Sequence, residues 1–220
     1  MIALQYIIFI LLSIVGAFAA VVFRWNYLGR KKMKYGNIIA KQQKPTIIFV
    51  IAYVLTAVIS VFVFNRKEMP LPLIIEYLIF WEAVFLCAVI DLKVKKIPNK
   101  IILILFVVRI VGLIFEYIHD GAFSTDKLIF SGLGLLVGGL FMLICMLLSK
   151  GGVGAGDVKL IAVIGLYYGL AGVLSILMVT LFFAAIYSIV MLLTKKAKMK
   201  STLPMAPFIF IGLSIHNILL

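Results

Sequence analysis

The sequence predicts an all-α, polytopic membrane protein with about eight transmembrane helices. Of its 220 residues, 65% are hydrophobic and only 13% are charged, whereas a soluble domain is about half apolar and a quarter charged. Apolar runs near the roughly 20 residues that span a bilayer recur along the whole chain. Basic residues gather in the short gaps between these runs, and no hydrophilic segment is large enough for a soluble domain. We therefore interpret residues 1–220 as a single membrane domain.

The first four predicted spans are separated by gaps of different charge. We expect these spans at about 2–23, 46–64, 73–90 and 101–118. No basic residue precedes the first apolar run and no small-residue cleavage site follows it, which indicates a permanent span rather than a signal peptide. The gap at 24–45 carries seven basic residues and no acidic one, and we interpret it as a short basic cytoplasmic loop.

The second half of the chain contains one apolar run that is too long for a single crossing. Residues 160–194 are apolar for 35 positions, more than a hydrocarbon core roughly 30 Å thick requires. Glycines inside this run predict a break between a short sixth helix and a full seventh one, at Gly165, Gly169 and Gly172. The remaining spans are expected at 128–148 and 203–220.

The basic residues orient the predicted bundle. Alternate gaps hold 17 of the 21 lysines and arginines, namely 24–45, 91–100, 149–159 and 195–200. Eight spans place all four gaps on one side, which the positive-inside rule makes cytoplasmic. We therefore expect a multi-pass protein of the cell membrane with both termini outside. The net charge of +13 is explained by this topology and by contact with anionic lipids, so nucleic acid is not an expected partner.

Two aspartates stand out because they are the only acidic residues at the predicted cytoplasmic face, Asp91 and Asp157. Ionisable groups near membrane depth indicate function by default. Two adjacent carboxyl groups can share one proton, so that one activates water while the other polarises a peptide carbonyl. Two structural alternatives stay open: Asp91 could be a solvated anion among neighbouring lysines, and Asp157 could only cap a helix.

The residues around the aspartates predict sharp turns. Four glycines in the six residues 151–156 precede Asp157, and they allow another chain segment to approach the backbone closely. A phosphate-binding loop is excluded because the Gly-Lys-Ser/Thr ending is missing. Pro98 favours an extended conformation at Ile97 and predicts a turn between the third and fourth spans.

Other polar residues in the predicted spans favour structural roles. Glu82 and Arg109 lie at matching depth on the third and fourth spans, which predicts a structural ion pair. A metal site is not expected, because neither cysteines nor histidines occur at ligand spacing. Glycines in the fifth span indicate close helix packing rather than chemistry, at Gly132, Gly134, Gly138 and Gly139.

Three segments together resemble the bacterial type IV prepilin leader peptidases, which are Gly-x-Gly-Asp aspartic membrane proteases. The first runs from Asp91 to Ile97-Pro98-Asn99 and is similar to the family's first catalytic aspartate with its Ile-Pro-Asn segment. The second, Gly-x-Gly-Asp-x-Lys-Leu, comprises Gly154, Gly156, Asp157 and Lys159. The third, residues 203–208, resembles the Pro-x-x-Pro-Phe segment that opens the last helix. The resemblance covers roughly residues 71–213, which would form the peptidase core.

The resemblance implies a function. Asp91 and Asp157 would be catalytic, and five residues would support the loops or the substrate: Pro98, Asn99, Gly154, Gly156 and Lys159. The substrates would be prepilins or pseudopilins, cut at the cytoplasmic face between a basic leader and a hydrophobic helix, without a cofactor. Many family members carry two Cys-x-x-Cys pairs after the first span and also methylate the new N-terminus. The gap 24–45 has no cysteine, so zinc and methylation are not expected here.

Two other functions remain as alternatives. One is a different Gly-x-Gly-Asp protease, such as a preflagellin peptidase, against which the Ile-Pro-Asn and Pro-x-x-Pro-Phe segments count. The other is a small ion-coupled transporter. Transporter sites lie near the membrane midplane, often between repeated halves, whereas the aspartates are predicted at the cytoplasmic edge and no repeat is visible.

Overall fold

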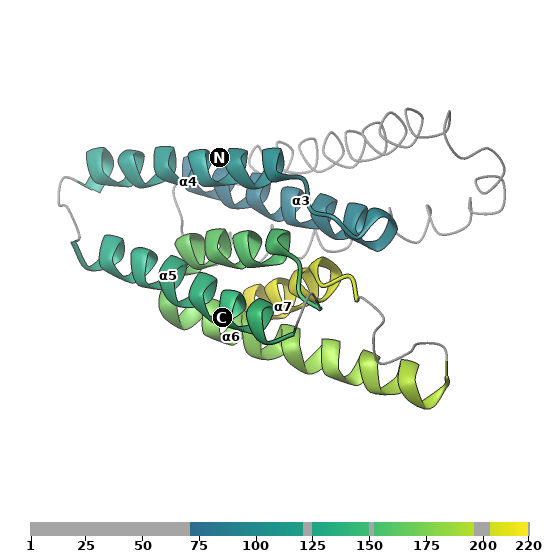
Figure 1. The fold of residues 1–220 in the computed structure, drawn as a ribbon. Helices are drawn as coiled ribbons and strands as arrows, with labels where there is room; N and C mark the ends of the chain where they lie inside the picture. The colour runs from purple at the N-terminus through teal and green to yellow at the C-terminus, as the bar shows by residue number, and fades with distance from the viewer. Residues whose placement is uncertain (1–70, 121–124, 150–151, 196–202, 220) are drawn as a thin grey trace, which may run out of the picture. The chain divides into compact units, whose positions relative to one another are not determined.

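The computed structural model describes residues 71–120, 125–149, 152–195 and 203–219 (Figure 1). The chain divides into two compact units, Met1–Met69 and Pro70–Leu220, and every described residue belongs to the second. The predicted spans at 2–23 and 46–64 and the basic loop at 24–45 lie outside the described residues. The prediction of one membrane domain over 1–220 involves both units and stays a prediction.

The described part of the chain is helical throughout its regular structure. Its elements are α3 (Leu71–Val94), α4 (Asn99–Asp120), α5 (Thr125–Leu148), α6 (Ala155–Leu193) and α7 (Ala206–Leu219). The first four are long and apolar enough to cross a membrane, while α7 is apolar but has only 14 residues. The structure therefore confirms the all-α class and gives a helical membrane bundle.

Helix α6 consists of two helices joined at a sharp turn. Gly169 interrupts its 39 residues with φ 67° and ψ −173°, a conformation that essentially only glycine adopts. A straight helix would separate Ile161 and Val173 by about 18 Å, yet both lie against Gly138. Figure 1 shows the two parts of α6 running in different directions. The predicted break in the long apolar run is thus confirmed, and it lies at Gly169.

Glycines of α5 allow this helix to pack closely on α6. A Cβ at Gly134 would overlap the backbone of Gly165 and Gly169, and one at Gly139 would lie 3.1 Å from the Ala162 side chain. Close backbone approach between membrane helices commonly uses small residues in this way. The prediction of close packing holds for these positions and for Gly138, but a Cβ at Gly132 would meet nothing within 4 Å.

The last helix begins later than predicted. We expected a span over 203–220, but residues 203–205 are not helical and α7 starts at Ala206. Prolines explain the boundary: Pro204 disfavours helical structure in the residue before it, while Pro207 fits the first turn, where no intrahelical N–H bond is needed. The Met205 carbonyl accepts the first bonds of the helix from the amides of Phe208 and Ile209.

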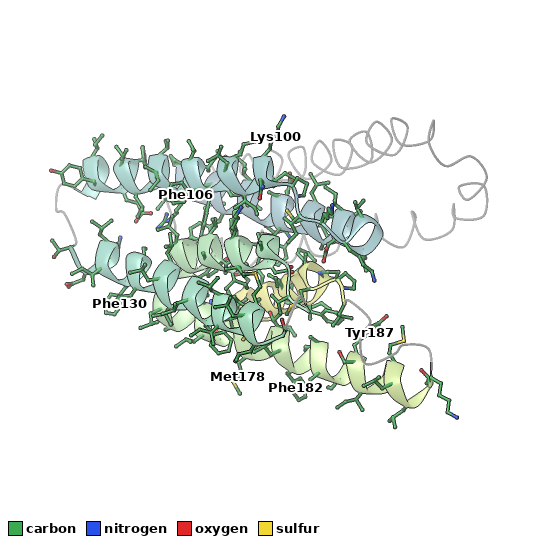
Figure 2. The ribbon with its side chains drawn as sticks, in the orientation of Figure 1. Lys100, Phe106, Phe130, Met178, Phe182 and Tyr187 are labelled. Atoms are coloured by element: carbon green, nitrogen blue, oxygen red, sulfur yellow. The ribbon has the colours of Figure 1, made fainter. Side chains whose placement is uncertain are left out.

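The core of the described unit lies among all five helices, and α5 contributes Met142 to it. Its fully buried side chains include Phe80, Trp81, Ile164 and Ile209. The outer surface is apolar as well, as the labelled Met178 and Phe182 on α6 illustrate (Figure 2); they are 77% and 61% exposed. Apolar residues on both the inside and the outside are what a helix bundle surrounded by lipid requires.

Candidate active site

Asp91 lies in the last turns of α3 and is buried. Its side chain is only 4% exposed, which excludes the alternative of a solvated anion among lysines. One carboxylate oxygen, Oδ2, accepts a hydrogen bond of 3.0 Å from the backbone amide of Ala206, the first residue of α7. A helix N-terminus stabilises negative charge through its amides and its dipole. Lys95, which ends the helix in a left-handed conformation, also acts on Asp91 through its positive charge.

Asp157 lies in the first turn of α6 and is 7% exposed. Its Oδ2 accepts a hydrogen bond of 3.1 Å from the amide of Gly154, so it caps its own helix, as one alternative supposed. Capping does not account for the whole carboxylate, because Oδ1 is buried without a hydrogen-bond partner. A buried polar oxygen without a partner is costly, and it leaves an atom available for chemistry.

The fold brings the two aspartates together across 66 positions of sequence. Asp91 lies in the last turns of α3 and Asp157 in the first turn of α6, near enough for the charge of Asp91 to act on Asp157. Two like charges in a poorly solvated site cannot both ionise without a large cost. Two neighbouring buried carboxyl groups favour one ionised and one protonated member, which is the state that water activation by a pair of carboxyl groups requires.

The connection between α3 and α4 packs directly on the glycine-rich start of α6. A Cβ at Gly156 would come within 3.0 Å of the Cβ of Ile97, so a larger residue would push the two segments apart. Lys159 adds a hydrogen bond of 3.2 Å from its Nζ to Asn99 Oδ1. The Ile-Pro-Asn segment and the Gly-x-Gly-Asp-x-Lys segment thus contact each other and fix the ends of α3 and α6.

Pro98 and Gly154 occupy the turns predicted for them. Pro98 lies immediately before α4, where its carbonyl accepts a hydrogen bond from the Ile101 amide. Gly154 is the N-cap of α6, and a Cβ there would lie 3.0 Å from Asp157 Oδ2. A side chain at position 154 would therefore crowd the carboxylate that its own amide binds.

One functional contact was missed by sequence reasoning. We noted the Pro-x-x-Pro-Phe segment as the opening of the last helix but did not predict that its backbone binds Asp91. The Ala206 amide lies 115 residues from Asp91, and a backbone group has no signature of its own in the sequence. The prolines that define where α7 begins were the available signal.

The predicted ion pair between Glu82 and Arg109 is wrong in its acidic partner. Arg109 Nη1 lies 3.1 Å from Glu76 Oε1 and 2.8 Å from Glu116 Oε1. Matching depth suggested Glu82, but helix rotation decides which side chains meet. Six residues turn a helix by about 240°, so Glu76 and Glu82 point to different sides of α3. Gly112 makes room for Glu76, because a Cβ there would overlap its carboxylate.

Among the described residues, no group of three or more histidine, cysteine or acidic side chains could hold a metal ion. The expectation that neither metal nor cofactor takes part stays a prediction.

Comparisons with known proteins place the chain in a family. Residues 77–189, just over half of the chain, match the Type IV leader peptidase family. Over 138 residues the chain is 28% identical to a Bacillus subtilis (strain 168) protein named prepilin leader peptidase/N-methyltransferase. This match covers 61% of the chain and 51% of the relative, so the chain spans about half the length of that protein. No solved structure matches.

The fold and the site define a helical membrane protein with a buried pair of carboxyl groups at the ends of its helices. The chain belongs to the type IV leader peptidase family. The matched residues lie within the predicted core at 71–213 and contain both aspartates, while the segment 203–208, which supplies the Ala206 amide, lies beyond them.

Proposed function

We propose that this protein is a membrane aspartic endopeptidase that removes the basic leader from prepilins or pseudopilins at the cytoplasmic face. One observation carries the proposal: two buried aspartates from distant parts of the chain lie within electrostatic reach, each bound by a backbone amide. The family and the name of the Bacillus subtilis relative support this substrate class.

The carboxyl pair supplies both proton transfers that peptide hydrolysis needs. The ionised carboxylate takes a proton from a water molecule, whose oxygen attacks the scissile carbonyl. The protonated carboxyl polarises the carbonyl oxygen, and a proton then passes to the leaving amine. Because the two groups titrate as one unit, we assign neither role to one residue. No step requires a cofactor.

The proposed orientation follows from the positive-inside rule. Eight spans, counting the two parts of α6 separately and adding two before residue 71, place Asp91 and Asp157 on the cytoplasmic side of the cell membrane. Labelling single cysteines at positions 125 and 198 with an impermeant reagent tests this topology. We expect position 125 outside and position 198 inside; labelling from the same side would refute the orientation.

The test of the activity is cleavage of a prepilin by membranes that contain this protein as the only candidate peptidase. We expect a shortened product whose new N-terminus follows the basic leader. Asp91→Asn and Asp157→Asn are the matched controls, since they keep side-chain shape but cannot share a proton as a carboxyl pair. Full activity in either variant at normal protein level would show that Asp91 and Asp157 are not the catalytic pair.

Two other functions are less well supported. A preflagellin-type protease would use the same aspartates, and cleavage of a preflagellin but not a prepilin in the same assay would favour it. An ion-coupled transporter would need its acids near the midplane, whereas both aspartates lie at helix ends. Cleavage of any leader peptide would count against transport as the main activity.

We further propose that the protein cleaves its substrates without methylating them. The relative is named as both peptidase and N-methyltransferase, but a methyl donor of cofactor size needs a pocket that buries most of its surface. The gap 24–45 is short, basic and free of cysteine and cannot form such a pocket alone. Mass spectrometry of a pilin matured by this protein should show no added methyl group; quantitative methylation that depends on this protein would contradict the proposal.

A further inference from the structure

The sharp turn at Gly169 leaves the first part of α6, residues 155–168, with an open C-terminal end. Carbonyl groups in the last turn of a helix have no intrahelical partner and must be satisfied elsewhere. In lipid, water cannot supply that partner, so protein groups must do so. These partners, together with the close packing on α5, therefore hold the short helix in place.

Two side chains from other helices bind these carbonyls. Tyr77 on α3 donates a hydrogen bond of 3.0 Å from its hydroxyl to the Tyr167 carbonyl. Arg109 on α4 donates one of 3.3 Å from Nε to the Leu166 carbonyl. Its positive charge also complements the negative end of the helix dipole, and its guanidinium carbon lies 5.5 Å from the centre of the Tyr167 ring.

Arg109 is itself fixed in place. Its Nη1 contacts both Glu76 and Glu116, so a guanidinium that is only 4% exposed is neutralised and oriented. A further bond of 3.0 Å, from the Tyr167 hydroxyl to the Leu105 carbonyl, ties the end of the short helix to α4. Gly134 of α5 also lies against the backbone of Gly165 and Gly169, so four helices, α3 to α6, meet at the turn.

Asp157 lies at the other end of the same short helix. Twelve residues separate it from Gly169, or about 18 Å of helix. Its own carboxylate has a single hydrogen bond, to the Gly154 amide, and its other oxygen has no hydrogen-bond partner. The position of Asp157 against Asp91 therefore depends mainly on how the helix that carries it is held.

We propose that Tyr77 and Arg109 are positioning residues of the active site, because they cap the far end of the short helix that carries Asp157. They contact neither aspartate and act only through helix 155–168. Loss of either contact lets this helix tilt or shift, which misplaces Asp157 relative to Asp91. The catalytic consequence rests on the proposed peptidase function, while the capping itself does not.

Tyr77→Phe and Arg109→Lys are the variants that test this proposal. The first removes one hydroxyl and keeps the ring; the second keeps the charge but cannot bind a carbonyl and two carboxylates with the same geometry. Tyr187→Phe is the matched control, because Tyr187 lies on the second part of α6, is 41% exposed and packs only its ring on Phe208.

The first measurement is amide hydrogen exchange in detergent, which needs no substrate. We expect peptides from 155–168 to exchange at least about threefold faster in Tyr77→Phe and Arg109→Lys, with 170–193 unchanged. The control should match the parent throughout. Unchanged exchange over 155–168 in Tyr77→Phe, or equal acceleration over both parts of α6, would overturn the proposal even if Arg109→Lys failed to fold.

The second measurement is prepilin cleavage per folded molecule. Misplacement of a catalytic group by about 1 Å can cost about a hundredfold in rate, so we expect kcat to fall by about 5- to 100-fold with KM within about twofold. A merely structural role would lower the amount of folded protein and leave kcat unchanged, which would overturn positioning. If the unsubstituted protein cleaves no prepilin, the proposed peptidase function is refuted. The hydrogen-exchange result would still show whether Tyr77 and Arg109 cap helix 155–168.

Discussion

Two groups of buried charges lie at different places in the bundle, and their surroundings differ in kind. The aspartate pair, Asp91 and Asp157, places two like charges near each other. The arginine cluster, defined as Glu76, Arg109 and Glu116, places a cation between two carboxylates. Each group contains a buried carboxylate oxygen without a hydrogen-bond partner, Asp157 Oδ1 in the pair and Glu76 Oε2 in the cluster. Burial is similar, at 4% and 7% exposure for the aspartates and 4% for Arg109. Burial alone therefore does not separate the proposed catalytic pair from a structural cluster.

The two groups differ in whether each buried charge has a neighbour of opposite charge that offsets its desolvation cost. A buried cation between two carboxylates recovers part of the desolvation cost through the attraction of opposite charges, and breaking such a pair destabilises the fold. A buried pair of like charges recovers little, so the fold must hold it in place by other contacts. Perturbed acids at such a position are functional-site candidates. The comparison predicts that changes to the aspartates act directly on the chemistry. Changes to the two carboxylates of the arginine cluster should lower mainly stability, and Arg109 should affect the chemistry only through the short helix that it caps.

The largest effect is expected at the aspartate pair. Asp91→Asn and Asp157→Asn should each lower cleavage by at least about a thousandfold, and the double variant should lose little more, because residues that act as a unit are not additive. Cleavage rates of the two single variants and the double variant, each normalised to folded protein, measure this. Losses that multiply in the double variant would show that the aspartates act independently.

A smaller loss is expected from the contact between the two motif segments. Gly156→Val should lower cleavage by about 10- to 100-fold, because its side chain would collide with Ile97 and shift the start of α6. Gly132→Val is the matched control on α5, since a Cβ there meets nothing within 4 Å. Cleavage assays at equal protein level compare the two. Equal activity in both variants would show that the close approach at Gly156 does not position the site.

At the arginine cluster we expect a loss of stability. Glu76→Gln removes one of two carboxylates from a buried guanidinium, which should lower the free energy of unfolding by about 1–3 kcal/mol. Asp126→Asn is the control, because Asp126 is exposed in the first turn of α5, and it should stay within about 0.5 kcal/mol. Thermal unfolding in detergent measures both. An unchanged Tm in Glu76→Gln would show that Glu116 alone satisfies Arg109.

The smallest effect is expected at the exposed edge of the aspartate site. Lys159→Met removes the hydrogen bond to Asn99 but keeps the length of the side chain, and an exposed contact of this kind contributes about 1 kcal/mol or less. We expect a loss of cleavage of about fivefold or less, with an unchanged Tm. A loss as large as that of the aspartate variants would show that Lys159 takes part in the chemistry itself.

The sequence by itself determined the features that depend on short windows of the chain. Hydropathy over about 20 residues predicted the helices of the described part, because lipid requires an apolar run of fixed length. The glycines around position 169 predicted the break in the long apolar run, because only glycine tolerates the backbone conformation found there. The two aspartates were singled out by charge, since acids are rare at the predicted cytoplasmic face.

Only the tertiary structure decided which groups meet. Depth along a helix can be counted from the sequence, but rotation about its axis is set by packing, and so Arg109 met Glu76 and Glu116 rather than Glu82. The Ala206 amide on Asp91 and the Tyr77 hydroxyl on the Tyr167 carbonyl join positions 115 and 90 residues apart. Such contacts are absent from any local pattern, because they form only after the helices have packed.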